Sequence, residues 1–452
     1  MPFRDDFYWG CATSAHQIEG AAFEDGKGLS VWDRFSHTPG KILEDHTADV
    51  ACDHYHRMEE DVRLMGELGM QAYRFSVCWP RILPEGTGKI NRRGLDFYSR
   101  LIDALLERGI RPIITLHHWD YPQALADKGG WLNPDSPRWF ADFAALCAGS
   151  FGDRARDFIT INEPQCLIAL GYGNGAHAPG LRLPCSFTVP MSHNVLLAHG
   201  LAVQALRANA KGCLVGYAPT GNACIPATET DEDIEAARKA YFSTPDGDLW
   251  AFTSAWWSDP VVLGRYPADG LEHFVQYLPA RWQDDLPAIA QKLDFYCQNI
   301  YNGTLVRKAD SEAGYEIVRK PAGTPQTAMG WYVMPQALYW GPKFLYERYR
   351  LPFVISENGM ADTDTVCLDG KVHDPSRIDY MHRYLAAYRR AAESGVDARG
   401  YLAWSFMDNF EWSDGYSRRF GLVYVDYRTQ QRIPKDSALW YRDVIAHNGA
   451  NL

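Results

Sequence analysis

Short apolar runs that look like β-strands alternate with segments of helical periodicity along almost the whole chain. The predicted strands cover residues 7–12, 71–77, 111–116, 158–161, 214–218, 293–300, 353–355 and 399–404. The predicted helices cover residues 53–68, 95–106, 137–151, 188–208, 335–349, 375–393 and 437–446. Such alternation requires parallel strands joined by right-handed crossovers, and eight units of this kind close into a barrel. We therefore predict an α/β protein, a single (β/α)8 TIM barrel over residues 1–452 with extended loops at the carboxyl-terminal face.

Two stretches do not fit this alternation. Residues 222–290 look irregular and rich in aromatic side chains, including Trp250, Trp256 and Trp257. Residues 303–325 break into short polar segments, which is typical of an inserted hairpin. Neither stretch has the composition of a linker, and single barrels with insertions run past about 400 residues. The chain is therefore predicted to form one domain.

Charge and cysteine usage narrow the class of protein. The net charge of −11 argues against a nucleic-acid partner or an anionic membrane surface. No apolar run reaches membrane-spanning length, and the first residues lack the pattern of a signal peptide. The 10 cysteines include no Cys-x-x-Cys spacing, so neither a zinc site nor a disulfide framework is indicated. These features indicate a cytoplasmic protein with reduced thiols, and they leave the oligomeric state open.

Two stretches place a glutamate where a predicted strand ends. In the stretch 157–164, DFITINEP, an apolar run stops at Glu163 and a proline follows. In the stretch 352–359, PFVISENG, a similar run leads to Glu357 and then to a glycine. Active sites of TIM barrels lie at the carboxyl ends of the strands, so the two glutamates suggest paired acid and base chemistry. Each glutamate could instead cap the helix that follows it.

Polar and aromatic residues accompany the glutamates at the same strand ends. They offer hydrogen-bonding groups and flat apolar faces, which suit a neutral polyhydroxylated ligand better than a phosphate or a metal ion. The residues are Gln17, Arg74, His118, Asn162, Asn299, Tyr301 and Trp404, followed after the last strand by Glu411 and Trp412.

One group of residues resembles a metal site. His54 and His56 lie close in sequence to Asp49 and Asp53, at the start of a predicted helix. Residues two apart do not share a helix face, because neighbours on one face are three or four positions apart. We therefore predict no bound metal and no cofactor.

Seven motifs occur in the order found in one enzyme family. They are SAHQIEG at 14–20, YRFS at 73–76, WPR at 79–81, HWD at 118–120, NEP at 162–164, SENG at 356–359 and WSFMDNFEW at 404–412. In these motifs the chain resembles the retaining β-glycosidases of glycoside hydrolase family one, the β-glucosidase family. The resemblance runs nearly from end to end and implies a small-molecule β-glycoside substrate.

The resemblance also implies a role for each site residue. Glu163 is expected to be the general acid/base and Glu357 the nucleophile of a double displacement through a covalent glycosyl-enzyme, with transglycosylation as a possible side reaction. Arg74 is expected to keep Glu357 charged, and Tyr301 to hydrogen-bond it. The expected sugar-binding residues are Gln17, His118, Asn162, Asn299, Tyr301, Trp404, Glu411 and Trp412.

Two alternative functions remain at this level. A non-catalytic sugar-binding barrel would typically lose one of the two carboxylates, and this chain keeps both. A 6-phospho-β-glycosidase would need cationic groups near the sugar 6-position, where this chain has Trp412. The sequence therefore favours an exo-β-glucosidase that acts on aryl glucosides or cello-oligosaccharides over both alternatives.

Four positions depart from the family pattern. Gln165 stands where the family usually has tryptophan, and Thr220 where asparagine is common. Tyr332 stands where an acidic residue is common, and His117 where an aromatic residue is more frequent. The first three lie on the leaving-group side, so the aglycone preference and the role of His117 stay open. The candidate aglycone residues are Gln165, Asn222 and Trp331.

Overall fold

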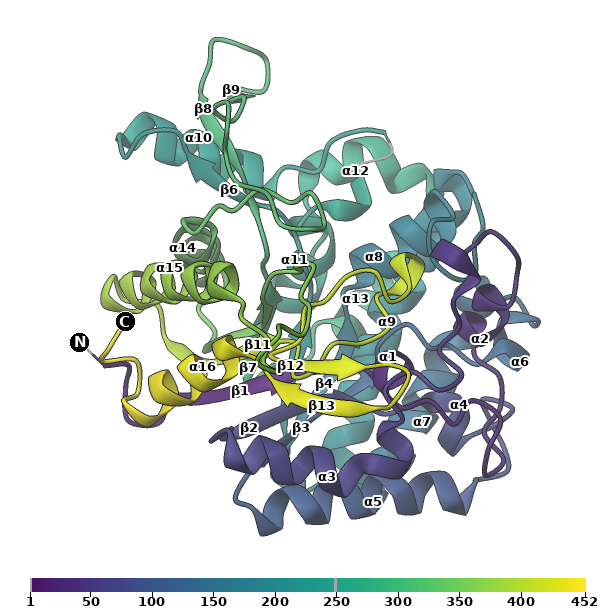
Figure 1. Ribbon diagram of the computed structural model, residues 1–452. Coiled ribbons are helices and arrows are strands. Elements are labelled where there is room, and N and C mark those ends of the chain that lie inside the picture. Colours follow the sequence, from purple (N-terminus) through teal and green to yellow (C-terminus); the bar gives the residue numbers. More distant parts are fainter. Residues whose placement is uncertain (1, 248–249) are drawn as a thin grey trace.

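Eight parallel strands close into a barrel in the computed structural model, which describes residues 2–247 and 250–452 (Figure 1). The strand order around the barrel is β1-β11-β10-β7-β5-β4-β3-β2, with each strand beside the next barrel strand in the sequence. The strands are β1 (Tyr8–Ala12), β2 (Ala72–Ser76), β3 (Arg111–His117), β4 (Asp157–Asn162), β5 (Leu214–Ala218), β7 (Phe295–Asn299), β10 (Phe353–Asn358) and β11 (Ala398–Trp404). The predicted (β/α)8 barrel is thereby confirmed.

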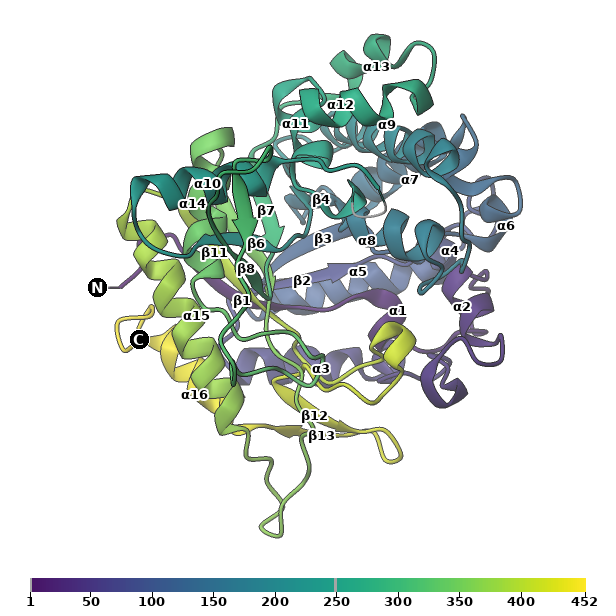
Figure 2. The ribbon, with the colours of Figure 1, turned by 90° about the horizontal axis from the view of Figure 1, so that it is seen from above.

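The main helices surround the strands, as the view from above shows (Figure 2). They are α3 (His54–Glu67), α5 (Arg92–Glu107), α7 (Ser136–Phe151), α9 (Cys185–Asn209), α14 (Ala337–Tyr349), α15 (Pro375–Glu393) and α16 (Asp436–Ala446). Helix α5 illustrates why these segments are helical. It buries Leu95, Tyr98, Leu101, Ile102 and Leu105, a spacing of three and four that forms one apolar stripe. That stripe covers the outside of the barrel.

The prediction of an irregular stretch at residues 222–290 is wrong. Its described part contains β6 (Ala223–Pro226), α10 (Asp231–Phe242), α11 (Ala255–Leu263), α12 (Ala268–Phe274) and α13 (Trp282–Ile289). Helices α11 and α13 are short and carry Pro260 and Pro287 in their interiors. Prolines usually end helices, and α11 buries residues all around its axis, so it shows no amphipathic period. Trp256 and Trp257 lie in α11 and are fully buried.

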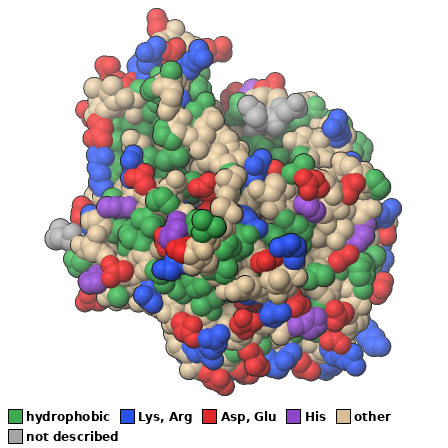
Figure 3. All heavy atoms as spheres, viewed as in Figure 1, with side chains coloured by type: hydrophobic (Ala, Val, Ile, Leu, Met, Phe, Trp, Pro, Cys, Tyr) green, Lys and Arg blue, Asp and Glu red, His purple; other side chains and the backbone are tan. Residues whose placement is uncertain are grey.

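The predicted hairpin at residues 303–325 is confirmed and belongs to a small sheet. Strand β8 (Gly303–Lys308) pairs antiparallel with β9 (Tyr315–Ile317) and parallel with β6. This three-stranded sheet projects beside the barrel, and acidic and basic side chains mix on its tip (Figures 1 and 3). It adds to the loops at the carboxyl ends of the barrel strands.

Shorter elements complete the fold. Short helices lie in the loops: α1 (Ala15–Ile18), α2 (Val31–Ser36), α4 (Trp79–Ile82), α6 (Gln123–Ala126) and α8 (Pro164–Ile168). After the last barrel strand, β12 (Val423–Asp426) and β13 (Gln431–Pro434) form an antiparallel hairpin that leads into α16. Among the residues described, no helix combines the length and apolar character needed to cross a membrane.

The histidines considered as metal ligands contact separate carboxyl groups. His54 Nδ1 lies 2.8 Å from Asp61, whereas His56 lies 2.6 Å from Asp53 and 3.1 Å from Glu24. Within the described ranges, no cluster of three or more His, Cys, Asp or Glu side chains could hold a metal ion. Among the described residues, none of the ten cysteines forms a disulfide bond.

Candidate active site

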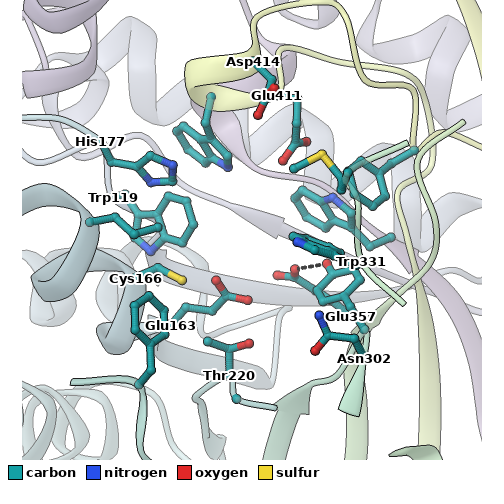
Figure 4. Close-up of a pocket in the computed structure, with 18 of the residues that line it drawn as sticks. Trp119, Glu163, Cys166, His177, Thr220, Asn302, Trp331, Glu357, Glu411 and Asp414 are labelled. Atoms are coloured by element: carbon teal, nitrogen blue, oxygen red, sulfur yellow. Dashed lines mark hydrogen bonds between the residues drawn. The ribbon is translucent and has the colours of Figure 1, made fainter. Parts of the chain in front are cut away.

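A cavity of about 370 Å³ opens at the carboxyl ends of the barrel strands, and Glu163 and Glu357 both point into it (Figure 4). Its size is in the range of pockets that hold small ligands. The predicted site residues that line it are His118, Glu163, Asn222, Tyr301, Trp331, Glu357, Trp404, Glu411 and Trp412. Segments from both halves of the chain therefore meet at one site.

The backbone at Glu163 is unusual. Strand β4 ends at Asn162 and α8 begins at Pro164, leaving Glu163 with a left-handed φ of 42°. Its amide donates to the carbonyl of Ala218 on β5 (2.8 Å), which holds the junction. Its side chain makes no capping hydrogen bond to α8, so the helix-cap interpretation loses its support. The carboxyl group is instead free to face the cavity.

Two further cavity residues share this left-handed backbone conformation. Trp119 has φ 77° and Trp412 has φ 49°. Such a conformation costs a non-glycine residue on the order of 1–3 kcal/mol and persists only where the surrounding structure holds it. The shape of the cavity is therefore held by its supporting contacts.

The carboxylate of Glu357 is bound at both oxygens. Arg74 Nη1 on β2 donates to Oε1 at 2.6 Å, and the hydroxyl of Tyr301 donates to Oε2 at 2.7 Å. Arg74 is itself buried, and it also donates to Asn162 Oδ1 at 2.6 Å and to Thr115 at 3.0 Å. Burial raises the pKa of Glu357, and the charge of Arg74 opposes that rise. The expected contacts of Arg74 and Tyr301 with Glu357 are thus present.

Glu163 has a neutral partner. Nδ2 of Asn299 donates to its Oε1 at 2.7 Å and to Asn162 Oδ1 at 3.0 Å. Burial raises the pKa of Glu163, while the hydrogen bond from Asn299 opposes that rise. Of the two buried carboxyl groups, only Glu357 contacts a guanidinium. When the pair carries one charge, the contact with Arg74 therefore favours that charge on Glu357 and the proton on Glu163.

Three of the predicted sugar-binding residues lie behind the cavity wall. Asn162 donates to Nε2 of His118 at 3.0 Å, and Asn299 holds Glu163 as described above. Gln17 Nε2 donates to the carbonyl of Phe410 at 2.9 Å and lies 3.4 Å from Glu411 Oε2. In this structure these amides position the side chains that line the cavity.

The cavity wall combines aromatic faces with a carboxylate. The ring of His118 stacks on Trp404 and on Trp412, with centroids 5.8 and 6.0 Å apart and both interplanar angles at 22°. Burial raises the pKa of Glu411 well above its usual range, with nearby Asp414 adding to the effect. Apolar faces and a hydrogen-bond acceptor are what a sugar ring needs.

The leaving-group side differs in part from the expectation. Asn222 and Trp331 line the cavity, and Trp331 packs against Tyr301 with centroids 5.2 Å apart. Gln165 does not line it, because its side chain is buried and bonded to the backbone of Thr220 at 2.9 and 3.2 Å. Gln165 therefore joins two loops.

Several lining residues were not predicted from the sequence. They are Trp119, Cys166, Leu170, His177, Gly221, Phe252, Asn302, Met329, Asp414 and Phe420. Thr220, which the sequence placed on the leaving-group side, also lines the cavity. Trp119 and Asp414 lie inside or next to recognised motifs, and that proximity was the available signal. Phe252 and Met329 come from long connections whose course no local pattern reveals.

His117 lies in an aromatic cage outside the cavity. Its ring is buried, and the ring centroid lies 5.4 Å from that of Trp131 and 6.1 Å from those of Tyr121 and Phe140. Neither ring nitrogen has a hydrogen-bond partner among the described residues. Burial lowers the pKa of His117 to about 3, so the imidazole stays neutral in the folded protein.

We expect His117→Phe to retain activity and to raise stability in a pH-dependent way. The unfolded histidine takes up a proton below its ordinary pKa of about 6.5, whereas the folded one does not until about pH 3. The unfolded state therefore binds more protons, and wild-type stability loses about 1.4 kcal/mol per pH unit through this residue below pH 6.5. Denaturant unfolding at pH 7.5 and pH 5 should show the variant gaining about 2 kcal/mol relative to wild type at the lower pH. A gain that does not change with pH would contradict this account.

Comparison with known proteins agrees with this geometry. The sequence profile of Glycosyl hydrolase family 1 matches residues 1–450. The chain is 45% identical over 449 residues to β-glucosidase A of Thermotoga maritima, covering 99% of this chain and 98% of that protein. It is 43% identical over 476 residues to a bifunctional β-D-glucosidase/β-D-fucosidase of Bifidobacterium breve, covering 100% and 99%.

Solved structures are similar over the same extent. A β-glucosidase from Thermotoga maritima in complex with glucoimidazole superposes with a TM-score of 0.91 at 44% identity and 99% coverage of both chains. The barrel, its paired carboxyl groups and the full-length match agree, and the chain therefore belongs to glycosyl hydrolase family 1, a family of retaining glycosidases.

Proposed function

We propose that this enzyme is an exo-β-glucosidase that cleaves small β-glucosides with retention of configuration. One observation carries the proposal: two buried carboxyl groups face one cavity with unlike partners, a guanidinium at Glu357 and an amide at Glu163. A retaining enzyme needs one ionised and one protonated carboxyl group on opposite sides of the scissile bond. The β-glucosidases among its relatives support a glucoside substrate.

In the first step, Glu357 attacks the anomeric carbon while Glu163 protonates the glycosidic oxygen. The bond to the aglycone breaks as the bond to Glu357 forms, giving a covalent α-glycosyl ester. Arg74 stabilises the carboxylate before attack, and the Tyr301 hydroxyl, bonded to its second oxygen, keeps the group oriented. The transition state resembles an oxocarbenium ion, whose positive charge the remaining negative charge of Glu357 stabilises.

In the second step, Glu163 acts as a base. Having given up its proton, it accepts one from a water molecule that attacks the anomeric carbon and displaces Glu357. Two inversions yield a β-configured sugar and restore both carboxyl groups. A sugar hydroxyl in place of water would give transglycosylation by the same step.

The wall of the cavity that carries Glu411 and Trp404 binds the glycone in this proposal. Glu411 can accept hydrogen bonds from two neighbouring hydroxyls, and the face of Trp404 can pack against the C–H face of the ring. Figure 4 shows Glu411 and Asp414 on the C-terminal loop, across the cavity from Glu163. Because an acceptor pair can shift between hydroxyls, the axial 4-hydroxyl of galactose or fucose should be tolerated. The bifunctional relative from Bifidobacterium breve supports this expectation.

A panel of nitrophenyl glycosides tests the glycone. We expect activity on β-glucosides and weaker or comparable activity on β-fucosides and β-galactosides. A 6-phosphate would bring roughly two negative charges near Glu411 and Asp414, so kcat/KM for the 6-phospho-β-glucoside should be at least about 10³-fold lower. A preference for the phosphorylated substrate would refute the glycone assignment and leave both catalytic assignments standing.

A further inference from the structure

We propose that Lys435, a fully buried residue outside the cavity, is a positioning residue for glycone recognition. Lys435 lies between β13 and α16, and its ammonium joins two loops that lead to the active site. We infer that this link holds the loop bearing Glu411 and Trp412 against the sugar. The inference rests on the proposed β-glucosidase function and concerns how its substrate is recognised.

The contacts of Lys435 are short and buried. Its Nζ donates to Oδ2 of Asp364 at 2.5 Å and to Oδ1 of Asp408 at 2.7 Å. The Lys435 and Asp408 side chains are 0% exposed and that of Asp364 is 2% exposed. Asp364 follows β10, the strand of Glu357, whereas Asp408 follows β11. One cation therefore fixes the distance between two loops of the carboxyl-terminal face.

Two arginines extend the link into a network of balanced charge. Arg377 Nη2 donates to Asp364 Oδ2 at 2.7 Å and Nη1 pairs with Asp374. Arg419 Nη1 donates to Asp408 Oδ2 at 2.6 Å, on the side opposite Lys435. Three cations thus face three carboxylates. A buried charge that loses its partner is strongly unfavourable, so this arrangement resists displacement of any one member.

The network acts on the sugar-binding loop through Asp408. Asp408 lies three residues before Glu411, and its carboxylate also accepts from the amide of Gly421 at 3.0 Å. The other side of the loop is held by Gln17, whose carbonyl accepts from the amide of Phe410 at 3.2 Å. The segment between residues 408 and 412 is therefore held by polar contacts on two sides.

Trp412 shows why this loop needs external support. Its φ of 49° is a conformation that a bulky side chain adopts only under constraint. Its ring lies nearly parallel to that of His16, with centroids 5.9 Å apart and an angle of 8°. If Asp408 loses its ammonium partner, the loop can relax, and Glu411 and Trp412 shift away from the sugar.

The catalytic carboxyl groups should respond less. Glu163 and Glu357 lie at the ends of β4 and β10 and are held by Asn299 and Arg74, neither of which contacts the network. Loss of the link should therefore weaken recognition of the sugar hydroxyls that Glu411 binds and spare bond cleavage itself. For a substrate that lacks those hydroxyls, kcat/KM should therefore change little.

The test compares nitrophenyl β-glucoside with its 4-deoxy and 6-deoxy analogues. For Lys435→Met we expect kcat/KM on the glucoside to fall about 10–30-fold, mainly through KM. On the deoxy analogues the loss should stay within about threefold, so the preference for the full glucoside shrinks. The pH profile of kcat should keep its shape, because Glu163 and Glu357 retain their partners.

The matched control is Arg432→Met. Arg432 lies on the same hairpin, has a side chain that is 2% exposed, and pairs with Asp61 of α3 at 2.9 Å. Its link to the sugar-binding loop is indirect, through the carbonyl of Cys52, whose thiol donates to the carbonyl of Asp408 at 3.0 Å. Arg432→Met should lower the melting temperature as Lys435→Met does, and it should change kcat/KM for all three substrates by the same factor. A selective loss in this control would show that any damage to the hairpin disturbs recognition, which would overturn the role of Lys435.

A second variant covers the case in which Lys435→Met does not fold. Lys435→Met combined with Asp364→Asn removes one charge of each sign and keeps the network balanced, and the same selective loss is expected. Equal losses on the glucoside and its deoxy analogues would overturn the inference. A wild-type protein that fails to cleave β-glucosides would instead refute the proposed function.

Discussion

Glu357→Gly is expected to abolish hydrolysis of β-glucosides and to regain activity in the presence of azide. Without the carboxylate no glycosyl ester can form, and loss of a nucleophile costs roughly 10⁶-fold in another hydrolase. The glycine leaves room beside Arg74 and Tyr301, where an azide ion can reach the anomeric carbon. One inversion then replaces two, so the product should be the α-glycosyl azide, identified by NMR of the product from an activated aryl glucoside.

Glu357→Gln serves as the matched control for this variant. The amide fills the same space without a charge, so it should be as inactive as the glycine variant and should not respond to azide. Formation of the β-azide by Glu357→Gly, or wild-type activity in either variant, would overturn the assignment of the nucleophile.

Glu163→Ala is expected to slow substrates in proportion to how poor their leaving groups are. Proton donation matters most when the departing oxygen is basic, and general acid catalysis is worth about 10²–10⁴-fold. The rate of cleavage of cellobiose and alkyl glucosides should fall by that factor, whereas dinitrophenyl glucoside should form the glycosyl-enzyme at nearly the wild-type rate. Steady-state and burst kinetics on both substrate classes measure the difference. An equal loss for all leaving groups would indicate a structural role for Glu163.

The pH dependence gives an independent check on the same residue. Burial raises the pKa of Glu163, so in the wild type this group keeps its proton to a higher pH than an exposed glutamate does. The alkaline limb of kcat/KM should therefore disappear in Glu163→Ala with an activated substrate. The acid limb should persist, since activity falls as Glu357 becomes protonated. An alkaline limb unchanged in the variant would assign that limb to another group.

The fold was predictable where local pattern and tertiary role agree. Helix α5 shows its buried stripe in the spacing of Leu95, Leu101 and Leu105, and β4 shows its burial as an unbroken apolar run. The prediction failed at α11, where Pro260 breaks the usual rule and burial on all sides hides the helical period. Tertiary packing stabilises that helix, and no local propensity reports it.

The candidate site was predictable as far as its motifs extend. Glu163 and Glu357 stand at strand ends that the sequence marks with apolar runs, and the barrel rule assigns both to one face. Gln165 lies two residues after Glu163 in sequence, yet its side chain hydrogen-bonds the backbone of Thr220. Phe252 and Met329 reach the cavity from distant connections. Direction of a side chain and the course of a long loop depend on packing, which a short window of sequence does not contain.

The sequence by itself determined the strand–helix alternation, the two glutamates at strand ends and the resemblance to a glycosidase family. The tertiary structure alone decided how their environments differ. Arg74 lies 283 residues from Glu357 and contacts it at 2.6 Å, while Asn299 lies 136 residues from Glu163 and contacts it at 2.7 Å. Charge stabilisation and desolvation depend on distance through space and on burial. The separation of two residues along the chain determines neither their distance in space nor their burial. The unlike states of the two similar glutamates therefore arise only when the barrel closes.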